Sequence, residues 1–357
     1  MSSRIVRHRF RSMLHFSVEM TPRLRFISLL ALLFLLCILN ILLGSVSLSA
    51  VDVWQSVIGG DDVPETVKYI VLRSRLPQMI TALLAGAALG TGGLVMQTLF
   101  RNPLADPSIL GVNAGAGLGA AIAILCFGGS MVGGIFSFSG FAMTTLLALV
   151  GAMSVVFLLL WCNRLMRSNL MLLISGVMIS YIVSSVVSLL NFYATDYGVQ
   201  SYVFWGMGNF GGLSDYRLLL FAACILPVLF VLLFFINPLN ALLLGEDYAH
   251  NLGISVRRVR FWLLFITGWL SAVVTACCGP IAFIGLAVPH IARFLFGSSN
   301  HRTILPATIL LGAVIALLCN LLSHIAGGRG MIPVNVLTPI IGVPVVLAVM
   351  LRRRGES

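Results

Sequence analysis

The feature that most constrains this chain is a series of long apolar runs that carry no charged side chain. The first, Phe26–Leu43, spans 18 positions without a charge, and its only amide side chain is Asn40. A helix needs about 20 apolar residues to cross the hydrocarbon core of a bilayer. The runs are continuous, whereas strands of a membrane barrel alternate apolar and polar residues. The sequence therefore predicts an all-α polytopic membrane protein.

Composition supports the same class. Of the 357 residues, 59% are hydrophobic and only 9% are charged. Soluble domains are about 45–50% apolar and about 25% charged. One soluble core cannot hold this much apolar surface, because the exterior of a soluble protein needs polar cover. The composition therefore excludes a soluble enzyme, a disordered chain and a fibrous protein.

Ten runs between polar or Gly/Pro breaks are candidates for transmembrane helices, and the third and eighth are the shortest. They are Phe26–Leu48, Leu76–Leu99, Gly111–Phe127, Phe141–Cys162, Leu170–Phe192, Leu218–Ile236, Phe261–Cys278, Ile281–Phe296, Ile304–Ala326 and Val334–Leu351.

The distribution of basic residues predicts the orientation. Ten spans place both termini on one side of the membrane, and cytoplasmic loops carry an excess of Lys and Arg. With cytoplasmic termini, 17 basic residues lie inside and 5 outside. We therefore expect residues 1–25 to form a basic cytoplasmic tail, 26–351 a ten-helix transmembrane domain, and 352–357 a cytoplasmic C-terminal tail. The net charge of +11 is then a topology signal, and no nucleic-acid partner is expected.

The sequence shows no group that would supply energy for moving a solute across the membrane. No Asp, Glu, Lys or Arg falls in the middle of a predicted span, although ion-driven transporters commonly carry intramembrane relays. The single lysine, Lys68, lies in an outer loop, so a Walker A motif is absent. Any ATP must therefore be hydrolysed by a partner. The alternative from the residues alone is a self-sufficient secondary transporter or channel for a small solute.

Catalytic and metal sites are not expected. Ser175 and His290 are the nearest formal nucleophile and base, and no motif supports them. The cysteines form no CxxC pair, and the spans hold no cluster of His, Asp or Glu for a free metal ion. His290 could be imagined as a metal or haem ligand, but a lone histidine near a helix end is more often a structural hydrogen-bonding group.

Two inner segments carry most of the remaining information. Pro103 and Pro107 forbid a continuous helix between the second and third spans, which predicts a rigid inner turn. Before this turn, Gly86 and Gly90 form a GxxxG pair, for which close helix packing is a simpler explanation than ligand contact.

The second inner segment, residues 237–260, has helical pieces broken by Gly245 and Gly253. It fits either a docking helix for a soluble partner or an ordinary interfacial helix.

Several motifs together resemble the permeases of bacterial ABC importers for iron-siderophores, haem and cobalamin. The resemblance covers about residues 70–352, with the motifs in family order and spacing. The segments that carry it are Gln97–Gly111, Leu244–Gly253, Ile284–Arg293, His301–Arg302 and Ile332–Pro344.

The resemblance implies a multi-pass subunit of the bacterial inner membrane that is not itself an enzyme. Such a permease works as a homodimer with two cytoplasmic ATP-binding subunits, and a periplasmic substrate-binding protein delivers the chelate. No cofactor is expected on this chain, since ATP–Mg belongs to the partner ATPase.

The resemblance also implies roles for individual residues. The predicted ATPase-coupling residues are Gly245, Glu246, Asp247, Tyr248, Ala249, Leu252 and Gly253. Asn102, Leu104, Asn169 and Leu170 are expected to narrow the cytoplasmic end of the path. A short helix around Ser201–Phe210 is expected to gate the outer end, through Ser201, Phe204, Trp205 and Phe210. Docking of the binding protein is assigned to Arg73, Arg75 and Arg329. One departure is Met331, which stands where the family commonly has Glu.

Overall fold

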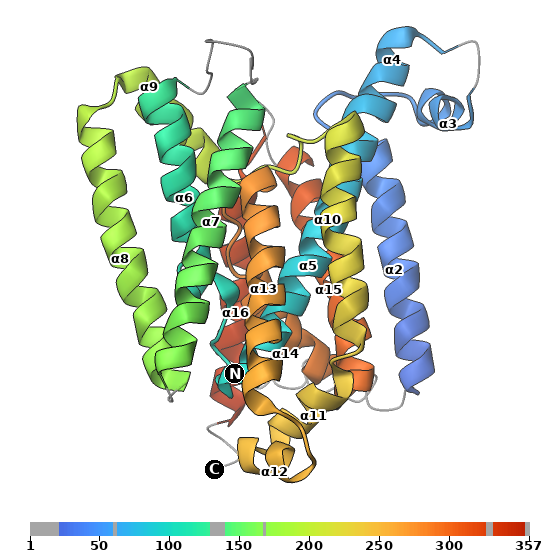
Figure 1. Cartoon of the computed structure of the whole chain (residues 1–357). Coiled ribbons are helices and arrows are strands. Elements are labelled where there is room, and N and C mark those ends of the chain that lie inside the picture. The colour runs from blue at the N-terminus through green and yellow to red at the C-terminus, as the bar shows by residue number, and fades with distance from the viewer. Residues whose placement is uncertain (1–20, 60–62, 129–139, 167–168, 326–330, 354–357) are drawn as a thin grey trace, which may run out of the picture.

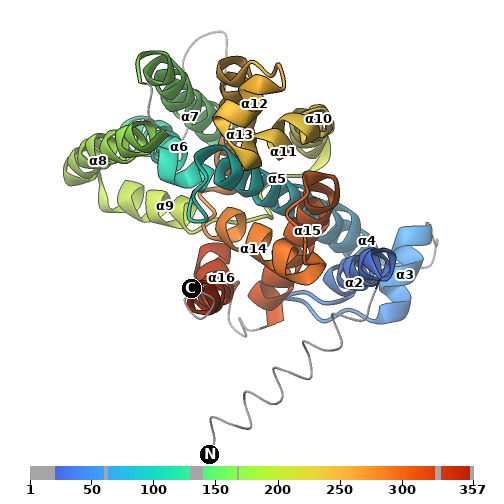
Figure 2. The ribbon, with the colours of Figure 1, turned by 90° about the horizontal axis from the view of Figure 1, so that it is seen from below.

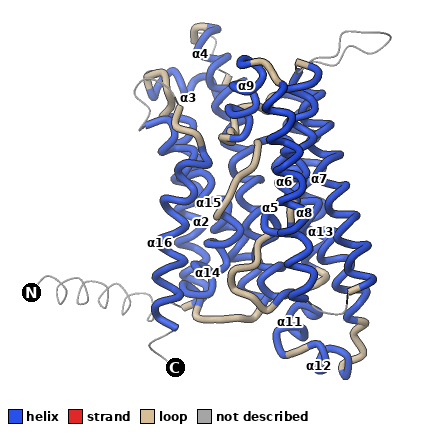
Figure 3. The backbone as a smooth tube through the Cα atoms, turned by 90° about the vertical axis from the view of Figure 1, so that its left-hand side faces the viewer, coloured by secondary structure: helices blue, strands red, loops and turns tan. Residues whose placement is uncertain are grey.

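The predicted apolar runs are helices in the computed structural model, which describes residues 21–59, 63–128, 140–166, 169–325 and 331–353. Every regular element in these ranges is helical. The long helices run side by side as one bundle, and short helices lie at both of its ends (Figure 1, Figure 3). The all-helical prediction is confirmed for the described residues.

Within the described residues, seven helical stretches are long and apolar enough to cross a membrane. They are α2 (Pro22–Leu42), α4 with the π-helical η1 and α5 (Glu65–Phe100), α7 (Gly140–Leu165), α8 (Asn169–Tyr193), α10 (Asp215–Leu233), α13 (Val256–Cys278) and α15 (His301–Ile325).

The other three predicted spans are shorter apolar helices: α6 with η3 (Val112–Ala121, Ile122–Cys126), α14 (Ile284–Phe296) and α16 (Val334–Arg353). Of the two predicted tails, residues 1–20 and 354–357 lie outside the described part of the chain.

Three predicted boundaries are wrong. The helical stretch that contains the second span begins at Glu65, eleven residues before the expected Leu76. The first helix ends at Leu42, six residues before the expected Leu48. The reason is Arg75, whose Nη1 donates to the carbonyls of Ile41 and Leu42, both at 2.8 Å, and so binds the end of α2. The seventh helix begins at Val256 instead of Phe261. The inner loop is therefore shorter than expected, and its arginines belong to a helix.

The short elements lie at the ends of the bundle. One end carries α3 (Ala50–Ile58), α4 (Glu65–Tyr69) and α9 (Asp196–Gly206). The opposite end carries α11 (Ile236–Leu244) and α12 (Glu246–Asn251). The 3-10 turn η2 (Pro107–Leu110) packs inside the bundle, where a Cβ on Gly92 of α5 would lie 3.3 Å from Pro107 Cγ. The functional residues predicted from the sequence therefore divide between two ends of one scaffold.

The centre of the bundle is α5 (Leu76–Phe100), seen from below in Figure 2. Its most apolar stretch is 89% buried, against 11% for α8. Small residues permit this burial because they let backbones approach closely. A Cβ on Gly86 would lie 2.1 Å from the carbonyl oxygen of Gly312 on α15. The packing interpretation of this glycine is confirmed.

A buried amide cluster holds α2 against the centre. Asn320 on α15 donates to Asn40 Oδ1 at 2.8 Å and accepts from Gln78 Nε2 at 3.0 Å. All three residues are at most 5% exposed. Polar side chains that bond across helices stabilise packing where no water competes. The single amide of the first apolar run is thus a helix–helix contact.

Candidate functional site at the two ends of the bundle

The inner knob, residues 236–253, projects from one end of the bundle and consists of α11 and α12 (Figure 1). Gly245 joins the two helices with φ of 136°, a conformation that residues with a Cβ rarely adopt. A Cβ at this position would lie 2.8 Å from Nη2 of Arg101. Glycine therefore lets the knob sit directly on the end of α5.

The predicted coupling residues all belong to the inner knob. Ala249 and Gly245 are buried and form its interior contacts. Glu246 is half-buried and forms an ion pair with Arg260 at the start of α13. The remaining four are exposed: Asp247, Tyr248, Leu252 and Gly253. The knob thus offers an acidic and apolar surface to whatever contacts this end.

Hydrogen bonds connect the inner knob to the centre of the bundle. The buried ring of His301 lies between Asn240 of α11 and Thr98 of α5. Its Nδ1 is 2.9 Å from Asn240 Oδ1, and its Nε2 is 2.9 Å from Thr98 Oγ1. Arg101 Nε adds a longer bond of 3.4 Å to the carbonyl of Leu242. These bonds connect the knob to both α5 and α15.

The helix is interrupted at the inner turn after α5, as predicted, and side-chain hydrogen bonds hold this turn. His290 Nε2 lies 2.8 Å from the carbonyl oxygen of Pro103, which is the structural hydrogen bond favoured from the sequence. Asp106 Oδ1 accepts bonds from the Ser108 N–H at 2.8 Å and from Ser108 Oγ at 2.5 Å. Burial raises the pKa of the Asp106 carboxyl, and these two bonds oppose that rise.

The residues expected to narrow the inner end of the path lie on this turn and on α8. Asn102 Oδ1 accepts a 2.9 Å bond from the backbone N–H of Leu104. Leu104 is 37% and Leu170 65% exposed, so both side chains face outward from this chain. Asn169 begins α8.

At the opposite end, α9 is held by the loops around it. The Asn335 N–H donates to the carbonyl of Met207 at 3.1 Å, and Asn335 Oδ1 accepts from the Ala282 N–H at 3.2 Å. The Asn209 N–H donates to the carbonyl of Cys278 at 2.8 Å. The end of α9 is thus linked to the starts of α14 and α16.

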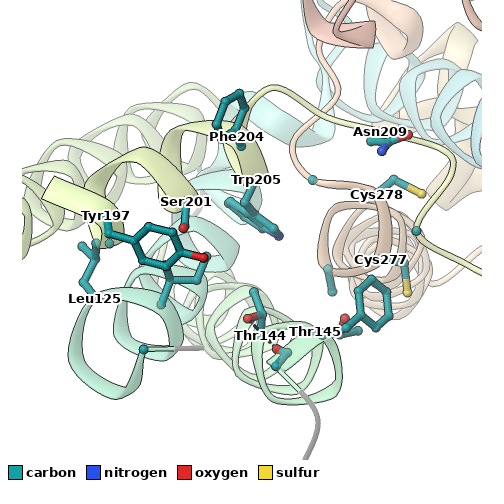
Figure 4. A pocket seen from close by; sticks show the side chains of 18 of the residues that line it. Leu125, Thr144, Thr145, Tyr197, Ser201, Phe204, Trp205, Asn209, Cys277 and Cys278 are labelled. Atoms are coloured by element: carbon teal, nitrogen blue, oxygen red, sulfur yellow. Dashed lines mark hydrogen bonds between the residues drawn. The ribbon is translucent and has the colours of Figure 1, made fainter. Parts of the chain in front are cut away.

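A cavity of about 590 Å³ lies between α9, α7 and the end of α13 (Figure 4). Ser201, Phe204 and Trp205 of α9 line one side, and Thr144 and Cys277 lie across from them. Its wall mixes hydroxyl groups with aromatic rings. The cavity separates α9 from the facing residues of α7 and α13.

Three of the four predicted outer-gate residues therefore share this cavity, and the fourth does not. The helix expected to continue to Phe210 ends at Gly206. Phe210 is fully buried, at 0% exposure, in the loop that follows. Its side chain packs in the core and is not placed at an opening.

The predicted docking arginines are in different surroundings. Arg73 is exposed and forms an ion pair with Asp215. Arg75 is only 6% exposed, because its guanidinium binds carbonyls at the end of α2. It is not available at the surface, contrary to the expectation. Arg329 lies outside the described residues, and the nearby Met331 is 45% exposed.

The described residues contain no group of three or more His, Cys, Asp or Glu side chains that could hold a metal ion. The residues missed by sequence reasoning are the connectors Asn240, Thr98 and Arg260. Thr98 and Arg260 are polar side chains at the ends of apolar runs, which is a signal that could have identified them, whereas Asn240 lies in the middle of α11.

Comparison with known proteins gives concordant matches. The model of the FecCD transport family matches residues 32–352. The vitamin B12 import system permease protein BtuC of Klebsiella pneumoniae is 36% identical over 325 residues, covering 91% of this chain and 95% of that protein. BtuC of Citrobacter koseri is 35% identical over 344 residues, covering 96% and 99%.

A solved structure of a metal-chelate type ABC transporter, in an inward-facing conformation, has a TM-score of 0.80 at 31% identity, covering 93% of this chain and 100% of that chain. The family match extends over far more than half of the sequence. This chain therefore belongs to the FecCD transport family.

Proposed function

We propose that this chain is the membrane permease of a binding-protein-dependent ABC importer for cobalamin or an iron chelate, either a siderophore or haem. Separate ATP-binding subunits supply the energy. The observation that carries the proposal is the inner knob, an exposed helical projection bonded to α5 and α15 through Arg101 and His301. Family membership agrees with this arrangement.

Ten membrane crossings with cytoplasmic termini are part of the proposal. The start of α2 and the end of α16 lie at the knob end of the bundle (Figure 1). Arg257 and Arg258 lie near the knob at the start of α13, as the positive-inside rule requires of a cytoplasmic end. The 13 residues of α14 rise only about 20 Å. The buried or half-buried segment 279–283 completes that crossing, since non-helical backbone is tolerated inside protein.

The partners are a second copy of the chain, two ATP-binding subunits and a periplasmic binding protein. The poor burial of α8 supports the second copy, because a path for a bulky chelate needs a second wall. Exposed Leu104 and Leu170 would then face the path between the copies. The relatives carry vitamin B12 import or metal-chelate names, which sets the substrate class.

The test is reconstitution. The chain in liposomes, supplied with ATPase and binding protein, is expected to take up one chelate from a panel of cobalamin, haem and ferric siderophores, with ATP required. The chain alone is expected to hydrolyse no ATP. Uptake by the chain alone, driven by a proton or sodium gradient, would instead identify a secondary transporter.

Arg73→Glu is expected to weaken capture of the binding protein by roughly fivefold, because it reverses a charge on the proposed docking face. The effect should grow as salt is lowered, since exposed charges are screened by ions. The measurement is binding of the substrate-binding protein to reconstituted permease at two salt concentrations.

The matched control is Asp215→Asn, which removes the partner of Arg73 and keeps its positive charge. It should leave capture unchanged or slightly tighter. Equal affinities for wild type and Arg73→Glu at low salt would reject the docking assignment.

A further inference from the structure

A groove of about 470 Å³ lies between α10 and α13 in the half of the bundle nearer the inner knob. It falls within the about 300–1,000 Å³ typical of ligand pockets. Every residue that lines it is apolar. The α10 side presents Pro227, Val231 and Phe235, and the α13 side presents Trp262, Phe265 and Trp269.

The aromatic wall of the groove is ordered by its own contacts. Trp269 donates its indole N–H to the carbonyl of Cys224 on α10 at 3.1 Å, which joins the two helices. Phe265 stacks on Trp269 with ring centroids 6.3 Å apart. Trp262 meets Phe265 edge-on at 6.1 Å. The groove is therefore preformed and does not depend on a ligand to hold it open.

Arg258 lies on the same face of α13 as the three aromatic residues of the groove, which we call the groove stripe. Arg258 precedes Trp262 by four residues, Phe265 by seven and Trp269 by eleven, a spacing that repeats on one helix face. It lies about 6 Å below Trp262 along the axis. Arg258 is exposed and forms no ion pair with a described residue. An apolar groove thus ends in an unpaired arginine.

The neighbouring arginines differ in this respect. Arg257 is also exposed but is rotated by about 100° from Arg258 around the helix, away from the groove stripe. Arg260 is engaged with Glu246 of the inner knob. Of the three arginines, Arg258 alone lies on the helix face of the groove and forms no ion pair with a described residue.

We propose that this groove binds an anionic phospholipid, with one acyl chain along Trp262, Phe265 and Trp269 and the phosphate at Arg258. An apolar tail and a single anionic head are the chemistry that the site complements. Basic residues beside grooves between membrane helices bind anionic head groups, and Trp rings favour the depth just below them. The inference requires only that α13 starts at a membrane surface, so it does not depend on cargo or transport direction.

The test compares two brominated lipids as quenchers of tryptophan fluorescence. The full chain is reconstituted in phosphatidylcholine vesicles in which the same minor fraction is brominated phosphatidylglycerol or brominated phosphatidylcholine. We expect the anionic lipid to quench more, with about fivefold preference from one charge contact. Arg258→Gln should abolish the preference, Arg257→Gln should keep it, and Trp262→Phe should reduce the extra quenching.

A second variant tests the groove itself. Val231→Phe adds a ring to an exposed wall position without adding a tryptophan while Arg258 remains, and it should also remove the preference. Equal quenching by both lipids in the wild type would overturn the proposed lipid site. So would an equal loss of the preference for the anionic lipid in Arg258→Gln and Arg257→Gln. Weaker ATPase-subunit binding by Arg258→Gln with lipid preference unchanged would assign Arg258 to that partner. A preference retained by a chain that fails to import leaves the lipid site standing and rejects the proposed function.

Discussion

Replacing Glu246 by Arg is expected to abolish ATP-driven uptake while leaving the chain inserted in the membrane. Glu246 begins α12 on the projecting inner knob and is half-buried beside Arg260. Glu246 lies on the proposed ATPase-contact surface, and truncating one partner of a charge pair across an interface costs about 2–5 kcal/mol, or about thirtyfold or more in affinity for the ATPase subunit. The measurements are co-purification of the ATPase subunit and uptake by proteoliposomes.

The control separates partner contact from local structure. In the double variant Glu246→Arg with Arg260→Glu, the intramolecular pair is restored with reversed charges. Uptake should remain lost if Glu246 faces the ATPase. Recovery of uptake in the double variant would show that the residue serves only the pair with Arg260. Glu65→Arg at the opposite end, where Glu65 pairs with Lys68 at 3.5 Å, should leave ATPase binding intact.

Gly93→Ala is expected to cause the largest loss of stability from a single methyl group. A Cβ on Gly93 would lie 1.7 Å from the carbonyl oxygen of Gly285, so α5 and α14 would have to separate. Overpacking against side chains typically costs 1–3 kcal/mol, and backbone cannot rotate away. We expect the free energy of unfolding to fall by about 3 kcal/mol and the Tm to fall by roughly 5–10 °C. The Tm is measured as the temperature at which heated, detergent-solubilised protein loses its monodisperse size-exclusion peak.

Gly206→Ala is the matched control, because a Cβ there would meet no atom within 4 Å. Its Tm should equal that of the wild type. A Gly93→Ala chain with wild-type Tm would show that the α5–α14 contact is looser than the structure indicates. A fall in Tm with ATPase binding preserved would confine the effect to packing.

The helices were predictable because a bilayer demands length and apolarity, and both can be read locally. The runs around α7 and α8 were found within a few residues of their ends. The end of α2 was missed because it depends on Arg75, 33 positions away from Leu42. Such a contact leaves no local pattern.

The candidate sites were predictable to different extents. The inner knob was visible from Gly245 and Gly253, which interrupt helical sequence. Phe210 and Arg75 were misjudged because an aromatic ring or a guanidinium near an end of a bundle can point either way. The structure turns both inward. Burial is a property of the neighbours, which sequence distance does not specify.

By itself, the sequence determined that the chain is a helical membrane protein, where its helices lie, and that it has no Walker A motif. These properties follow from hydrophobicity and from residue types, which act locally. The tertiary structure alone decided which glycines touch, such as Gly93 and Gly285, and that His301 joins the knob to α5. It also placed Pro227 and Val231 of α10 against the aromatic face of α13 that leads to Arg258. Those contacts join residues far apart in the chain, so only packing in three dimensions selects them.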